Sequence, residues 1–189
     1  MKMATCPVCN NIVLQSTQLE NSLPVLVCDS CGGTWIRANE YTLWLKSQKP
    51  GSFDMSRTKE ASSRFPITES NKAAICPDCR HFLRRYKIGA SIDFHLDRCS
   101  SCNGVWLDRN EWQSLKMADL HDEINQMFTK PWQQNIQNEM EAKQLDSMYL
   151  EKFGEADYKK IKEIRKWLWD NPNHHALIAF LLDKEPFSY

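Results

Sequence analysis

The sequence predicts a small metal-bound α+β fold, in which one compact unit occurs twice and an α-helical C-terminal region follows. Three observations support this prediction. All eight cysteines of the 189-residue chain fall into four Cys-x-x-Cys pairs. The first two pairs and the last two are offset by about 70 residues and have similar surroundings, which indicates one fold used twice. Beyond the last pair, apolar residues recur with the spacing of amphipathic helices.

The cysteines supply two complete sets of metal ligands. Four thiolates are the full tetrahedral set of a structural zinc ion and leave no position open for chemistry. Each unit spans about 40 residues, too few to bury an adequate core unaided, so zinc would hold the unit folded. The sequence therefore predicts a non-enzymatic protein with two zinc ions as cofactors. The predicted ligands are Cys6, Cys9, Cys28 and Cys31 in the first unit and Cys76, Cys79, Cys99 and Cys102 in the second.

The residues leave two other uses of the cysteines open. Disulfide bonds would need an oxidising compartment, but the N-terminal residues contain no apolar signal core and no apolar run is long enough to cross a membrane. We therefore expect a cytoplasmic, reducing location, where such pairs bind metal. Redox chemistry is the second alternative, because four thiolates can also hold iron and Cys-x-x-Cys pairs can cycle as disulfides.

The repeat divides the chain into four segments. The stretch between the two units is rich in Pro, Gly, Ser and mixed charge and shows little periodicity, which is typical of a linker. The helical pattern begins after the second unit. The predicted segments are 1–47 for the first unit, 48–73 for the linker, 74–115 for the second unit and 116–189 for the helical C-terminal region.

Each unit is predicted to form a β-hairpin between its two cysteine knuckles, because apolar runs flank a polar or turn-forming stretch there. One tryptophan in each unit, Trp35 or Trp106, is expected to pack over the hairpin of its own unit, where a single indole forms a large share of a small core. The apolar runs that predict the strands are 12–14, 25–27, 82–83 and 92–96.

Helix signals mark the ends of both units and the C-terminal region. Residues 39–47 have helical character, and Asp108 followed by Glu111 predicts a capped helix start. Pro131 is expected to interrupt or restart the helix, and Gly154 to end it. Further helices are predicted over 155–169 and 174–183.

The motifs of both units carry a family resemblance. The second unit reads Cys-Pro-x-Cys from Cys76, then Cys-x-x-Cys-x-Gly-Val-Trp-Leu-Asp from Cys99, with Glu111 opening a helix. Both units resemble the transcription-factor-IIB-type zinc-ribbon family, a resemblance that covers roughly half the chain and does not extend to the helical region. The first unit departs from it at Ile36-Arg37, where the family has Leu-Asp. The resemblance implies zinc binding and suggests interaction with nucleic acid or transcription proteins.

Charge and composition favour a protein partner. The chain carries 24 basic and 24 acidic residues, so its formal net charge is zero. The helical region adds apolar stripes with several tryptophans, and exposed tryptophan and tyrosine are enriched at binding hot spots. We expect an adaptor whose ribbons and helical tail bind a protein partner or a second copy of the chain. A membrane partner and a small-molecule substrate are not expected.

Nucleic-acid binding is the alternative function. Arg84, Arg85, Tyr86 and Lys87 combine basic and aromatic residues on the second predicted hairpin. Their cationic groups could meet backbone phosphates while Tyr86 stacks on a base. A transcription-associated factor would fit these residues and the family resemblance.

The two units are expected to differ in stability and to unfold separately. Arg37 stands where the second unit has Asp108, and a cation near a helix N-terminus is unfavourable. The first unit should therefore lose zinc first. A flexible linker should transmit little coupling, so Cys28→Ser is expected to unfold the first unit alone.

Overall fold

The computed structural model describes residues 3–20, 22–48 and 74–184. Apart from Gln48, the predicted linker at 48–73 lies outside these residues. The chain divides into two compact units, Met1–Glu139 and Met140–Tyr189, which are described separately below. No helix in the described ranges is long and apolar enough to cross a bilayer.

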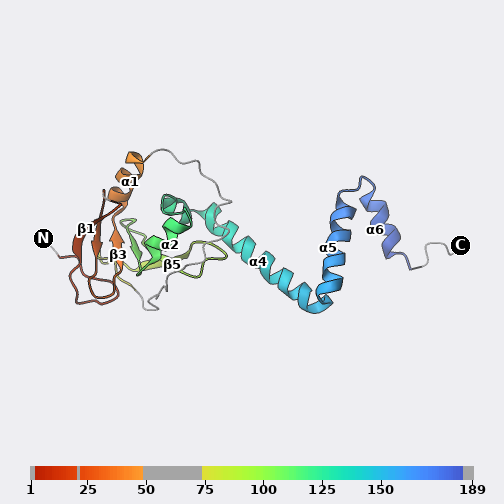
Figure 1. Ribbon diagram of the computed structural model, residues 1–189, viewed down its shortest axis with the longest axis horizontal. Coiled ribbons are helices and arrows are strands. Elements are labelled where there is room, and N and C mark those ends of the chain that lie inside the picture. The colour runs from red at the N-terminus through yellow and green to blue at the C-terminus, as the bar shows by residue number, and fades with distance from the viewer. Residues whose placement is uncertain (1–2, 21, 49–73, 185–189) are drawn as a thin grey trace. The chain divides into compact units, whose positions relative to one another are not determined.

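One antiparallel sheet of six strands runs through both ribbons of the first unit. The first ribbon contributes three strands and the second ribbon three, in the order β1-β2-β3-β6-β5-β4. The ribbons join where β3 pairs with β6 (Figure 1). In this pairing Trp35 lies opposite Trp106. The strands are β1 (Gln15–Leu19), β2 (Leu23–Val27), β3 (Thr34–Ile36), β4 (Leu83–Lys87), β5 (His95–Cys99) and β6 (Val105–Leu107).

Two predicted strands are placed differently by the structure. The first strand is the polar segment Gln15–Leu19, an edge strand whose first four residues are exposed. The apolar run at 12–14 precedes it, because Leu14 donates its N–H to the Ala4 carbonyl at 2.9 Å and ties the chain back to the first knuckle. Similarly, the buried Ile92 and Phe94 precede β5. The strands β3 and β6 were not predicted, since three residues are too few to show alternation.

The helices of the first unit pack with the sheet around one hydrophobic core. They are α1 (Ala38–Ser47), α2 (Glu111–Met117), α3 (Ile124–Met127) and the beginning of α4 (Lys130–Phe153). The core takes residues from both ribbons and from the helices, including Leu23, Val25, Tyr41, Trp44, Leu96, Trp112, Leu115, Ile124, Trp132 and Ile136. A single core across both ribbons contradicts the expectation that they fold independently.

Most helix boundaries follow the predicted signals, but the cap of α2 does not. Glu111 opens α2 as predicted, whereas the N-cap residue is Asn110 and its side chain forms no capping hydrogen bond. The predicted cap, Asp108, accepts the indole N–H of Trp106 instead, and its own N–H donates to the Glu111 carboxylate at 2.7 Å. Pro131 lies in the first turn of α4, where a missing N–H costs no hydrogen bond. Gly154 ends α4 with a φ of 75° and precedes α5 (Glu155–Trp169).

The second unit contains the end of α4, then α5 and α6 (His174–Leu182). None of the residues of α5 and α6 is buried. The boundary between the compact units falls inside α4, beyond residue 116, because α3 and the first turns of α4 belong to the core of the first unit.

Glu20, at the turn between β1 and β2, links the first ribbon to α2. Its carboxylate accepts the indole N–H of the buried Trp112 at 3.1 Å and the ammonium of Lys116 at 2.7 Å. The hydrogen bond from Lys116, followed by that from Trp112, lowers the pKa of Glu20.

We expect Glu20→Ala to destabilise the zinc-loaded protein by about 1–2 kcal/mol, because it leaves a buried indole N–H without its acceptor. The pKa of Glu20 is lowered, so the part of this contribution that comes from the carboxylate charge is present above the unfolded pKa of about 4.3 and is lost only as the pH falls through the folded value. Urea denaturation should therefore give the same difference from wild type at every pH from about 5 to 8. The control Glu20→Gln keeps an acceptor for Trp112 and should lose less than about 1 kcal/mol; an equal loss in both variants would contradict the indole assignment.

Candidate metal centres

The four cysteines of the first ribbon converge on one point. The Sγ atoms of Cys6 and Cys31 lie 3.6 Å apart and those of Cys9 and Cys28 lie 3.9 Å apart. All four sulfurs lie within 4.8 Å of one another. Cys6 and Cys28 are buried, so the centre is closed towards the sheet.

The second ribbon repeats this geometry. Cys76 and Cys102 place their sulfurs 3.5 Å apart, and Cys79 and Cys99 place theirs 3.3 Å apart. His81 Nδ1 lies 3.4 Å from the sulfur of Cys79. All eight predicted ligands are thus brought together in two sets of four.

Both sets fit a tetrahedral zinc ion. Zinc–sulfur bonds of about 2.3 Å place neighbouring sulfurs about 3.8 Å apart, close to the separations found in both ribbons. Each group can therefore hold one zinc ion. Because every ligand is a cysteine, no position is left for a substrate or an activated water, which is the pattern of a structural site.

The knuckle backbone supports thiolates at these positions. Burial raises the pKa of the Cys6 and Cys76 thiols above its usual range. The N–H groups of Cys9 and Cys79 point at these sulfurs, at 3.3 and 3.4 Å. The backbone N–H of His81 lowers the pKa of Cys79 to about 5. Four such thiols need a cation to ionise together, so metal binding should release protons and weaken in acid.

Tight turns after each cysteine pair use left-handed backbone. Asn10, Gly32, Arg80 and Asn103 have φ between 59° and 75°. Each donates its N–H to the carbonyl of the first cysteine of its pair. Glycine and asparagine adopt this conformation readily, whereas Arg80 is strained there. The Arg80 guanidinium donates to Thr5 Oγ1 of the first ribbon at 3.2 Å.

Each tryptophan covers a glycine of the other ribbon. A Cβ atom added at Gly33 would lie 2.1 Å from Cζ2 of Trp106, and one at Gly104 would lie 2.3 Å from Cζ2 of Trp35. Both indoles are buried, with exposed fractions of 0% and 1%. The expectation that each tryptophan packs over its own hairpin is therefore wrong in detail, because each ring reaches across the β3–β6 pair. Buried rings are not available to stack on a base.

Asp78 of the second ribbon accepts hydrogen bonds from two side chains of the first ribbon. Its Oδ2 atom accepts the indole N–H of Trp35 at 2.9 Å. The Arg37 guanidinium forms a bidentate contact with the same carboxylate, donating from Nε to Oδ2 and from Nη2 to Oδ1, each at 2.9 Å. In the second ribbon the corresponding indole, Trp106, donates to Asp108 of the same ribbon at 2.9 Å. The departure of Arg37 from the family pattern is therefore compensated by an acceptor from the other ribbon.

Arg109 of the second ribbon also reaches across to the first ribbon, this time as a donor. It donates from Nε to the carbonyl of Cys31 at 3.0 Å and from Nη2 to the carbonyl of Ser30 at 3.4 Å. Both acceptors lie in the second knuckle of the first ribbon. Sequence reasoning missed Asp78, Arg109 and Glu20 as joining residues. An alignment of the two repeats contains one signal for Asp78, because the charge changes at two positions. Val8 of the first repeat aligns with Asp78 of the second, and Arg37 aligns with Asp108.

The predicted nucleic-acid contacts lie on β4, at one edge of the sheet. Arg84 and Arg85 are exposed, but Nε of Arg85 lies 3.4 Å from a carboxylate oxygen of Asp97. Tyr86 packs edge-on against Phe128, with ring centroids 5.1 Å apart. Lys87 is half-buried. The strand therefore presents Arg84 and Arg85 to solvent but holds Tyr86 against the protein.

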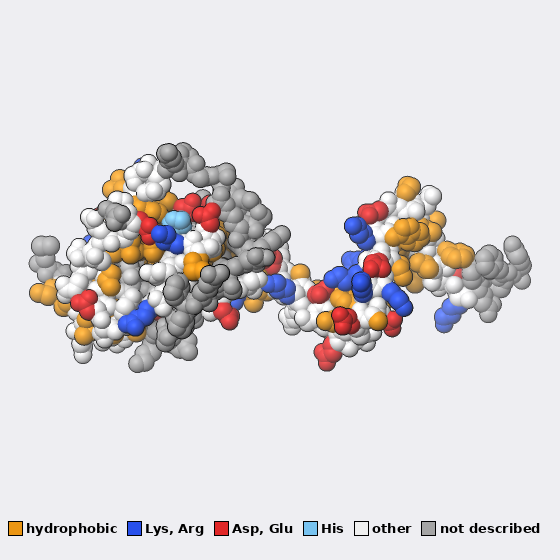
Figure 2. Space-filling view, in the orientation of Figure 1, with side chains coloured by type: hydrophobic (Ala, Val, Ile, Leu, Met, Phe, Trp, Pro, Cys, Tyr) orange, Lys and Arg blue, Asp and Glu red, His pale blue; other side chains and the backbone are white. Residues whose placement is uncertain are grey.

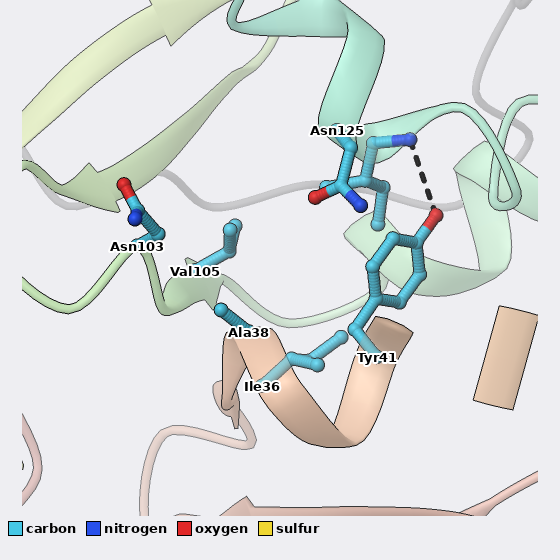
Figure 3. Close-up of a pocket in the computed structure, with 7 residues that line it drawn as sticks. Ile36, Ala38, Tyr41, Asn103, Val105 and Asn125 are labelled. Carbon is cyan, nitrogen blue, oxygen red and sulfur yellow. Dashed lines mark hydrogen bonds between the residues drawn. The ribbon is translucent and has the colours of Figure 1, made fainter. Parts of the chain in front are cut away.

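A small cavity lies where α1, β6 and α3 meet (Figure 3). Its volume of about 10 Å³ suits one water molecule and no substrate. Tyr41 beside it donates to the His121 carbonyl at 2.8 Å and accepts the N–H of Ile124 at 3.2 Å. The lining residues are Ile36, Ala38, Tyr41, Asn103, Val105, Ile124 and Asn125.

One known family model matches both copies of the repeat. Residues 5–47 and 75–118 each match the family model of the transcription-factor-IIB-type zinc ribbon, described as transcription factor zinc-finger. No curated protein and no solved structure matches the chain.

Proposed function

Because this chain carries two tandem zinc ribbons of the transcription-factor-IIB type, we propose that it is a non-enzymatic adaptor that binds a protein partner through its C-terminal helices. Zinc ribbons of this family are generally non-catalytic. The ribbons form a zinc-stabilised platform, and the observation that carries the proposal is the exposed apolar surface of the second unit.

This surface consists of apolar side chains that the described part of the second unit leaves uncovered. On α4, Leu145, Tyr149 and Phe153 follow one another at four-residue spacing and therefore share one helix face. On α5, Ile161 and Ile164 are 43% and 51% exposed. Figure 2 shows hydrophobic side chains gathered over α6 and Lys and Arg side chains over α5. The other exposed apolar residues are Met140, Met148, Leu150, Trp167, Trp169, Phe180, Leu181 and Leu182.

The size of the surface suits a protein interface. A buried aromatic side chain covers about 150–250 Å², so the half-exposed Tyr149, Phe153, Trp167, Trp169 and Phe180 together offer roughly 500 Å². The eight exposed aliphatic side chains add a comparable area, so the exposed apolar residues together offer on the order of 1,000 Å², which exceeds the roughly 800 Å² per partner of a standard interface.

A crevice between α4 and α5 indicates the chemistry of the partner. It has a volume of about 500 Å³ and is lined by Leu150 and Tyr158 together with three lysines and three carboxylates. The charged residues are Lys159, Lys162, Lys166, Asp146, Glu155 and Glu163. Lys162 is paired with Asp146 at 2.9 Å. The proposed occupant is an amphipathic helix of a partner protein, with an apolar face for the exposed stripe and charged residues of both signs beside it, because the crevice carries lysines and carboxylates in equal number.

Affinity purification of the full chain after nuclease treatment tests this proposal. We expect a protein whose capture survives nuclease and whose affinity, measured with purified components, falls at least about tenfold in the double variant Ile161→Ala, Ile164→Ala. The matched control Gln144→Ala, Ser147→Ala alters exposed polar residues of α4 and should bind like wild type. Equal binding by both double variants would contradict docking on this surface. A dimer in light scattering that only the isoleucine variant dissociates would show that a second copy occupies it instead.

Nucleic-acid binding is the second candidate, supported by one specific observation. Phe82 is 70% exposed next to the exposed Arg84 on the edge of the sheet, where an aromatic ring and a cation could meet a base and a phosphate. Fluorescence anisotropy with single- and double-stranded DNA and RNA at low salt would detect it. Binding that weakens in Arg84→Ala, Arg85→Ala and with added salt would favour this role; no binding at low salt would remove it.

A further inference from the structure

Each ribbon forms hydrogen bonds with a metal knuckle of the other ribbon. Asp78 stands between two ligands of the second centre, Cys76 and Cys79, and its carboxylate accepts from Trp35 and Arg37 of the first ribbon. Arg109 of the second ribbon donates to the carbonyl of Cys31, a ligand of the first centre. These contacts connect the residues next to one centre with strand β3 or the knuckle of the other.

The two centres also share one hydrophobic cluster. Its buried members include one cysteine from each knuckle together with Leu14 and both tryptophans. The rings reach the opposite glycines, so each ribbon completes the packing of its neighbour. The buried members are Cys6, Leu14, Cys28, Trp35, Cys76, Cys99 and Trp106.

We propose that the two zinc centres are thermodynamically coupled through these contacts, so that loss of one ion weakens the hold on the other. Each knuckle wraps around its ion, and metal binding is coupled to the folding of the residues that hold the metal. When the first ribbon loses zinc, β3 no longer holds Trp35 over Gly104 or presents Arg37 to Asp78. The knuckle at Cys76–Cys79 then loses the hydrogen bonds that Asp78 accepts from Trp35 and Arg37. Hydrogen bonds around a metal site orient its ligands. The coupling is reciprocal, because free-energy linkage acts equally in both directions.

Native mass spectrometry of the full chain during stepwise chelation tests the proposal. Two independent equal sites would place about half of the chains in the one-zinc form at half saturation, and unequal sites would place more. Coupling of tenfold or more reduces this fraction to about a quarter or below. We expect chains with two ions and chains with none to dominate. A one-zinc form at half or more would overturn the proposal.

The double variant Arg37→Ala, Arg109→Ala tests whether the contacts across the knuckles carry the coupling. Both side chains are exposed and all eight cysteines are kept, so the sheet and both ligand sets are preserved. The one-zinc fraction should rise from a quarter towards a half. The control Arg84→Ala removes another exposed arginine, far along the second ribbon, and should leave the fraction unchanged. An unchanged fraction in the double variant would overturn the assignment to these contacts.

The variant Cys28→Ser gives a second measurement that does not depend on a titration. It removes one ligand of the first centre, and we expect the second centre to release zinc at least about tenfold faster than in wild type. Hydrogen exchange should show lost protection in β6 as well as β3. Release at the wild-type rate with β6 protected would show that the ribbons act separately. Because the readouts are zinc release and exchange, neither result depends on the proposed adaptor role.

Discussion

Replacing Trp132 with alanine should destabilise the first unit by about 3–5 kcal/mol, the usual cost of removing a buried tryptophan. Trp132 lies near the start of α4, is 4% exposed and belongs to the common core. Its indole donates to the carbonyl of the buried Ile88 at 3.1 Å, so the substitution leaves both a cavity and an unpaired acceptor. Denaturation of the zinc-loaded protein measures the loss, and hydrogen exchange should show α3 and the first turns of α4 losing protection.

Trp167→Ala is the matched control for this prediction. Trp167 lies on α5 and is 55% exposed, so its removal should change stability by no more than about 0.5 kcal/mol. If Trp132→Ala cost no more than this control, α4 would not be anchored on the ribbons through its first turns.

Replacing Gly33 with alanine should destabilise the first unit by about 3 kcal/mol and lower its thermal midpoint by roughly 10 °C. The added Cβ would lie 2.1 Å from Cζ2 of Trp106, and the indole is 1% exposed, so it has no room to move away. Gly104→Ala should have a similar effect, because its Cβ would lie 2.3 Å from Trp35. Thermal unfolding with zinc in excess measures both variants.

Gly154→Ala separates this steric effect from backbone strain. At Gly154 a Cβ meets nothing within 4 Å, although φ is 75°. Its φ of 75° and ψ of 160° lie in a region that is essentially restricted to glycine, so the substitution should cost about 1–3 kcal/mol of strain at the α4–α5 junction and leave the midpoint of the first unit unchanged. Equal effects of Gly33→Ala and Gly154→Ala on that midpoint would contradict the reciprocal packing of tryptophan on glycine.

Local features of the fold were predictable from the sequence because local spacing determines them. The four Cys-x-x-Cys pairs predicted both ligand sets, since each knuckle needs only a few neighbouring residues to turn around a metal. The α5 prediction of 155–169 coincides with Glu155–Trp169, because Gly154 and the sequence from Asp170 to Pro172 mark its ends. The strands were placed less well, because β1 is a polar edge strand without an alternating pattern.

The sequence by itself therefore determined that this protein carries two four-cysteine zinc sites on a duplicated ribbon, followed by helices. Only the tertiary structure decided that the two ribbons form one sheet and share its hydrophobic clusters. The contacts that join them, such as Trp35 to Asp78, link residues 43 positions apart and have no periodic signature in the chain. Arg37 suggested a weak first ribbon because a cation opposes the start of α1. In the folded protein the Arg37 guanidinium lies 2.9 Å from the carboxylate of Asp78. The first repeat has no aspartate in the column of Asp108, and Asp78 of the second repeat supplies the carboxylate instead.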